Sequence, residues 1–113
     1  MRKGMAVDQG YLEHIKELLS PVEGVTYRAM FGGYGVFHEG DMFALISGST
    51  STLYFKVGDL NREAFQAAGS EAFGRMPYWE VPANVLEDSD QMQEWASVAV
   101  QVGHITATKK RPT

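Results

Sequence analysis

The 113-residue sequence contains no cysteine. This absence excludes disulfide bonds, thiolate metal ligands and thiol nucleophiles, and it suits a reducing compartment. The chain also lacks a long apolar run, because no stretch approaches the roughly 20 apolar residues of a membrane-spanning helix. Basic residues stand near the N-terminus, but polar residues interrupt the segment that would be the apolar part of an export signal. We therefore expect a cytoplasmic protein that does not associate with a membrane.

Basic residues are missing from most of the C-terminal third. The net charge is −4, and no lysine or arginine occurs between Arg75 and Lys109. The acidic residues of that stretch are Glu80, Glu87, Asp88, Asp90 and Glu94. Because a negative surface repels phosphate groups, this part of the chain is not expected to bind nucleic acid.

The composition is that of one globular domain. Apolar residues make up 44% and charged residues 21% of the chain, and its length suits a single hydrophobic core. We expect residues 8–103 to form this domain. Residues 1–7 are expected to be a flexible N-terminus and residues 104–113 a basic flexible tail, because apolar periodicity is lost there.

Helices are predicted near both ends of the chain. Asp8 can cap a first helix, in which apolar residues recur at helical spacing over residues 11–19. Asp88 and Gln91 have the spacing of a capping box and open the last helix. Gly103 is expected to end that helix.

Strands are predicted between these helices, because apolar residues alternate with polar ones. Glu39 and Gly40 stand where a tight hairpin turn is needed. After the fourth strand, Asp59 or Asn61 can cap a short helix that ends at Gly69. The predicted strands are residues 25–31, 34–38, 42–46, 52–57 and 75–81. Pairing of consecutive strands gives an α+β fold of order αββββαβα, with an antiparallel sheet of about five strands.

The sequence shows no catalytic or cofactor-binding pattern. The histidines His14, His38 and His104 lack the spacing of metal ligands, although the fold can still bring His38 close to Glu80. The glycines of residues 32–35 lack the spacing of a phosphate loop, and backbone shape explains them better. No GxSxG nucleophile motif occurs. We therefore expect no catalytic residues, no metal and no cofactor.

Glu80 is the best candidate for general acid–base chemistry. Burial beside Tyr78, Trp79 and Val81 would raise the pKa of its carboxyl group. Strand alternation instead points its side chain to solvent. A small enzyme that uses Glu80 is therefore kept as an alternative function.

Two sets of residues are candidates for contact with other molecules. Exposed apolar groups commonly mark protein interfaces. The candidate interaction surface consists of Phe31, Tyr34, Tyr78, Trp79 and Glu80. The basic residues that are candidates for contact with nucleic acid are Arg28, Lys56, Arg75, Lys109, Lys110 and Arg111.

Four segments in this order resemble the N-terminal domain of the TfoX/Sxy competence regulators. They are RAMFGGYGVF at residues 28–37, MFALI at 42–46, LYFK at 53–56 and MPYWEVP at 76–82. The resemblance covers residues 8–102. The segment before MPYWEVP is shorter than in many members of the family.

The resemblance implies helices on one face of an antiparallel sheet, similar to secretion-chaperone folds. It also implies a role in bacterial regulation of natural competence, and it brings no catalytic residues. Full-length members add a C-terminal helical domain, so we expect a stand-alone N-terminal domain here.

The leading hypothesis is a non-enzymatic regulatory domain that binds a protein partner and forms a homodimer. It is motivated by many aromatic residues in a chain without catalytic motifs. The alternative of a nucleic-acid-binding transcription accessory protein depends on the scattered basic residues, and the acidic last helix argues against it.

Overall fold

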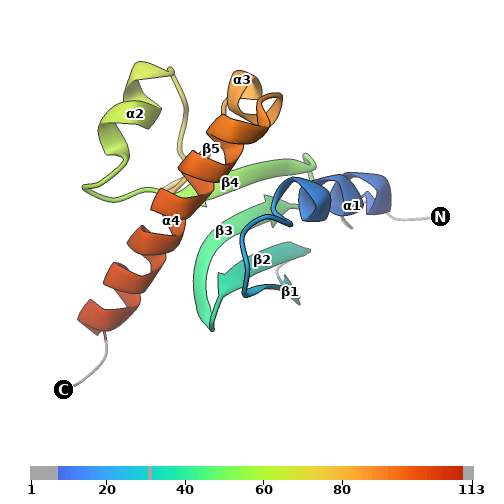
Figure 1. Ribbon diagram of the computed structural model, residues 1–113, viewed down its shortest axis with the longest axis horizontal. Helices are drawn as coiled ribbons and strands as arrows, with labels where there is room; N and C mark the ends of the chain where they lie inside the picture. The colour runs from blue at the N-terminus through green and yellow to red at the C-terminus, as the bar shows by residue number, and fades with distance from the viewer. Residues whose placement is uncertain (1–7, 31, 111–113) are drawn as a thin grey trace.

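A computed structural model describes residues 8–30 and 32–110 of the chain. Residues 1–7, Phe31 and residues 111–113 lie outside the described residues. The elements in chain order are α1 (Gln9–Leu18), β1 (Val25–Met30), β2 (Gly33–His38), β3 (Asp41–Ser47), β4 (Thr52–Lys56), α2 (Arg62–Ala67), β5 (Tyr78–Glu80), α3 (Ala83–Leu86) and α4 (Ser89–Lys110). Figure 1 shows the long helix α4 crossing the sheet.

The five strands form one antiparallel sheet in the order β1-β2-β3-β4-β5, as predicted. Glu39 and Gly40 connect β2 to β3 with φ angles of 50° and 92°. Two consecutive positive φ angles are the property of the type I′ turn, whose twist matches that of a hairpin. The α+β class and the meander topology are thus confirmed.

A β-bulge interrupts the pairing of β2 with β3. Val36 lies opposite Ala44, whereas the next residue, Phe37, lies opposite Met42. Phe43 is therefore the extra residue, and its fully buried ring packs 6.2 Å from the ring of Phe55. The bulge allows Phe43 and Ala44 to face the same core.

The core lies between the sheet and the helices α1 and α4 (Figure 1). Helix α1 contributes Leu12 and Ile15, which its 3.6-residue period places on one face. Its N-cap is Asp8 as predicted, because the carboxylate accepts the Tyr11 N–H at 2.9 Å. Helix α4 contributes Met92, Ala96, Ala99 and Val100.

Asp88 caps the last helix as predicted, but the capping box is not reciprocal, because the Asp88 N–H donates to the Val85 carbonyl and not to Gln91. Asp88 accepts the backbone N–H of Gln91 at 3.1 Å, and the Gln91 amide donates to the other carboxylate oxygen at 3.1 Å. These hydrogen bonds hold the pKa of Asp88 below its ordinary value. At α2, however, the Asn61 side chain binds Gly58 N–H and Lys56 C=O instead of capping the helix.

Helix α4 does not end at Gly103, so that prediction is wrong. The helix continues to Lys110, through most of the segment expected to be a flexible tail. A Cβ at Gly103 would lie 2.8 Å from the Met42 carbonyl oxygen and 3.2 Å from Phe43 Cβ. The glycine therefore permits close contact between α4 and β3 instead of stopping the helix.

The C-terminal strand is shorter than predicted. Strand β5 covers only Tyr78–Glu80, because residues 72–77 turn back beside it. The Phe73 N–H donates to the Tyr78 carbonyl at 2.7 Å, and the Val57 N–H donates to the Pro77 carbonyl at 2.8 Å. The four-residue helix α3, which follows Pro82, is too short for its apolar period to be recognised.

Replacement of Gly103 by alanine tests the contact between α4 and β3. Alanine is the better helix former, yet the added methyl group would overlap the Met42 carbonyl. We expect Gly103→Ala to lower the free energy of unfolding by about 1–3 kcal/mol, measured by urea denaturation. Ser97→Ala, at an exposed position of the same helix, is the control and should change it by less than about 0.5 kcal/mol. Equal stability of the Gly103→Ala protein would contradict the close contact.

Three of the five tyrosines are expected to titrate late, because burial raises the pKa of Tyr11 as well as those of Tyr27 and Tyr78. Burial raises the pKa of both Tyr27 and Tyr78 from 10.0 to about 12. The folded state therefore keeps these protons more tightly than the unfolded state, and stability should fall as the pH rises from 10 towards 12. Ultraviolet absorbance should show part of the tyrosinate forming near pH 12, and Tyr78→Phe should remove one such step. Titration of all five tyrosines together near pH 10 would contradict this expectation.

Candidate functional site

The second face of the sheet carries no helix among the described residues, and we call it the open face. Directly opposed residues of an antiparallel pair point to the same side of a sheet. One such row runs across the strands through Arg28, Gly35, Leu45, Tyr54 and Glu80. Side chains and loops alone therefore form this surface.

An apolar groove of about 730 Å³ lies on the open face and is open to solvent. We call it the methionine groove, because Met30, Met42 and Met76 line it. Leu45 and Ser47 of β3 and Tyr78 of β5 also contribute. The other lining residues are Gly32, Gly33, Ile46, Gly48, Ser49, Lys56, Phe73 and Pro77.

Two glycines of the MFGGYG motif shape one end of the groove. Gly32 has a φ of 76°, which favours glycine at the bend between β1 and β2. At Gly35, a Cβ would lie only 2.5 Å from Met30 Sδ and 2.9 Å from the Phe37 ring. Gly35 thus leaves room for Met30 on the open face, which confirms that backbone shape explains these glycines.

Residues 72–77 form the opposite wall of the groove. Ala72 pairs with Trp79 in an isolated bridge, and the Phe73 ring packs 4.8 Å from the Tyr54 ring. These contacts fix the loop on the sheet. Met76, at the rim, is 44% exposed.

Cationic side chains accompany the apolar residues of the open face. The Arg28 guanidinium lies 4.6 Å from the centre of the Phe37 ring. The Lys56 ammonium lies 5.5 Å from that of Tyr78, and Arg75 is exposed in the loop. Cation–π contacts hold such charges against the aromatic surface.

The basic residues predicted to contact nucleic acid do not form one surface. Lys109 lies on α4, near Asp59. The hydrogen bond from Arg62 is the main cause of the lowered pKa of Asp59, and the charge of Lys109 adds a weak contribution. The Lys110 side chain and Arg111 lie outside the described residues. Arg28 and Lys56 therefore lie on the open face, whereas Lys109 lies on α4 and is not part of that surface.

The residues of the predicted interaction surface are also divided. Trp79 faces the helices, with its ring 6.4 Å from that of Phe65, and Tyr34 lies on the same side opposite Ile46. Tyr78 and Glu80 face the other way. Phe31 lies outside the described residues.

Glu80 is not enclosed by its aromatic neighbours. Its side chain is exposed on the open face. Its backbone carbonyl accepts the Ser70 hydroxyl at 2.5 Å. His38 is three strands away in the sheet order, so the suggested pair of His38 with Glu80 does not form.

Sequence reasoning missed most residues of the methionine groove. Met42 shares the open face with Leu45 only because the bulge changes the alternation of β3. Phe73 and Met76 lie in a segment that was predicted to be partly strand. The MFGGYG motif was the only signal that pointed to this region.

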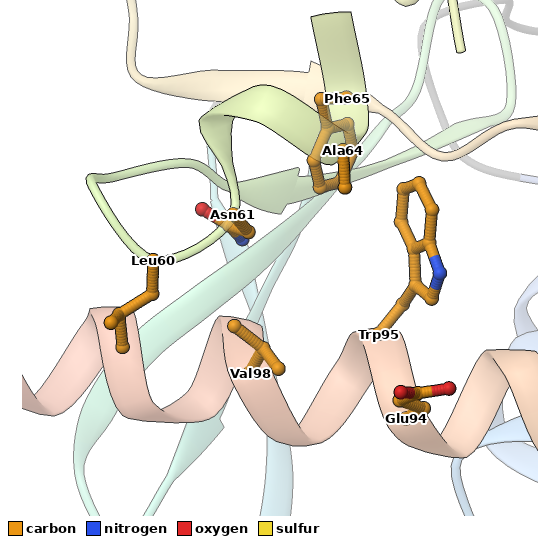
Figure 2. A pocket seen from close by; sticks show the side chains of 7 residues that line it. All are labelled: Leu60, Asn61, Ala64, Phe65, Glu94, Trp95 and Val98. Atoms are coloured by element: carbon orange, nitrogen blue, oxygen red, sulfur yellow. The ribbon is translucent and has the colours of Figure 1, made fainter. Parts of the chain in front are cut away.

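A second, smaller hollow of about 160 Å³ lies between α2 and α4 (Figure 2). Leu60, Ala64 and Phe65 line one side, and Glu94, Trp95 and Val98 of α4 line the other. The Phe65 and Trp95 rings pack edge to face with centres 4.7 Å apart. Since the hollow is small and its aromatic rings pack on each other, the methionine groove is the better candidate for a binding site.

Comparison with known proteins is consistent with this architecture. None of the described helices is both long and apolar enough to cross a membrane. No curated protein matches the sequence. The family model of the TfoX N-terminal domain matches residues 17–103, which include all five strands and most of α4. The chain therefore belongs to the TfoX N-terminal domain family.

Proposed function

We propose that this chain is a non-enzymatic, competence-regulator-like domain that binds a protein partner in the methionine groove. The occupant is an apolar segment of the partner that also carries carboxylate side chains. The observation that supports this proposal is an apolar groove on a sheet face that no described helix covers. We also propose a cytoplasmic location, which the absence of cysteine suits.

The lining of the groove favours apolar side chains of more than one shape. Met30, Met42 and Met76 have flexible, polarisable side chains, which adapt to different partners. Large apolar patches on a monomer commonly mark interaction sites. A regulatory domain that contacts several partner sequences needs such a surface.

The charges beside the groove favour an acidic partner. Arg28 and Lys56 lie on the same face as the apolar lining, and Arg75 is exposed in the adjacent loop. Complementary charges steer association and fix the register of a bound segment. A peptide with glutamate or aspartate beside its apolar residues therefore fits better than a basic one.

Selection from a displayed library of random peptides tests the proposal. We expect enriched peptides to combine large apolar residues with carboxylates, and to bind more weakly as salt is added. Binding should be followed by NMR of protein labelled in its methionine methyl groups. The signals of Met30, Met42 and Met76 should move, whereas that of the buried core residue Met92 should not.

A matched pair of variants locates the binding surface. Met76→Asp places a charge at the groove rim and should weaken binding of the selected peptide at least about tenfold, equal to about 1.4 kcal/mol. Leu60→Asp, at a 56% exposed position beside the second hollow, should leave it unchanged. Peptides that bind equally to both variants would contradict the proposal. Methyl shifts that depend on protein concentration alone would show a homodimer in the groove and would also contradict it.

A further inference from the structure

Four polar residues from distant parts of the chain meet beside the β2–β3 turn. His38 ends β2, Glu39 lies in the turn, and Asp41 begins β3. His104 reaches them from α4, because this helix continues past Gly103. The two histidines are 66 residues apart in the sequence, so no local motif indicates this cluster.

Hydrogen bonds fix the rings in a defined arrangement. His104 Nδ1 lies 2.7 Å from Asp41 Oδ2, and Asp41 has a side chain only 10% exposed. A carboxylate only accepts hydrogen bonds, so His104 carries its proton on Nδ1. In the neutral imidazole, His104 Nε2 then presents a lone pair, and this nitrogen lies 2.8 Å from His38 Nδ1.

We propose that His38, Glu39 and His104 bind a divalent transition-metal cation such as Zn²⁺. One ligand atom from each of these residues lies within 4.8 Å of the others. Two nitrogens on a tetrahedral zinc are about 3.3 Å apart, given bonds of about 2.0–2.1 Å. The two imidazoles therefore need to separate by only about half an ångström. His38 would then carry its proton on Nε2.

The surroundings of the three ligands suit a metal. The bond from His104 to Asp41 is the carboxylate–histidine arrangement that orients metal-bound imidazoles and increases their basicity. The two carboxylates, Glu39 and Asp41, balance the charge of a divalent cation. At Gly24, a Cβ would lie 3.3 Å from His38 Nε2, so glycine leaves room for the His38 ring.

Imidazole and carboxylate ligands favour zinc, cobalt or nickel over calcium and magnesium, which prefer oxygen alone. Three protein ligands leave a fourth position for water or a group from a partner. The bound ion would join the C-terminal turns of α4 to the β2–β3 hairpin. This site is separate from the methionine groove, so the two proposals can fail independently.

Titration of the intact protein with Zn²⁺ by calorimetry, and with Co²⁺ by visible absorbance, tests the site. We expect saturable binding of one ion in the micromolar range, and Co²⁺ should give the spectrum of a nitrogen- and oxygen-ligated ion. Zn²⁺ should also raise the Tm, because it binds the folded state. His38→Ala and His104→Ala should abolish saturable binding and the rise in Tm.

Milder variants separate binding from folding. Asp41→Asn should weaken Zn²⁺ binding about 10- to 100-fold, as expected for a residue that orients a ligand. Glu39→Gln changes an exposed side chain, so it should weaken binding without lowering the Tm of the metal-free protein. His14→Ala, at an exposed position on α1, is the matched control and should bind normally. The proposal would be overturned if the unaltered protein showed no saturable Zn²⁺ binding. It would also be overturned if the His38→Ala and His104→Ala proteins bound Zn²⁺ as tightly as the unaltered protein.

Discussion

The backbone contact between α4 and β3 at Gly103 determines much of this structure. Gly103 lies against the Met42 carbonyl, and Gly58 leaves similarly little space beside Val102. Helix α4 thus approaches the backbone of β3 closely at Gly103, whereas side chains such as Met92 and Val100 lie between the helix and the sheet elsewhere. The buried Phe43 lies at this contact, where its Cβ faces Gly103. Because the helix is held there, its last turns extend towards the β2–β3 hairpin.

The two faces of the sheet differ because of the β-bulge. Regular alternation would place Phe43 on the same face as Leu45. The bulge instead lets Phe43 join the core beside Phe55, while Leu45 remains in the methionine groove. One extra residue in β3 therefore supplies the core with an aromatic ring while Leu45 lines the methionine groove on the other face.

The sequence predicted those parts of the fold that depend on neighbouring residues. The caps at Asp8 and Asp88 and the turn at Glu39 and Gly40 are local, so residue type and spacing identify them. The family was recognisable from the MFGGYG and MPYWEVP motifs.

The remaining features depend on contacts between distant segments. Gly103 has the properties of a helix terminator, and only the Met42 carbonyl opposite it explains why the helix continues. Trp79 points towards Phe65 because β5 begins at Tyr78 and pairs Trp79 with Phe55 of β4. The alternation of residue types in the sequence does not determine that pairing. The meeting of His38 with His104 likewise requires the completed fold.

The wall formed by residues 72–77 has a consequence for how such domains diversify. These residues pair with the outer edge of β5 and do not belong to the core cluster. Insertions and deletions are tolerated best in surface loops of this kind. Changes in the length of this segment can therefore deepen or shorten the methionine groove while the sheet and its core stay intact.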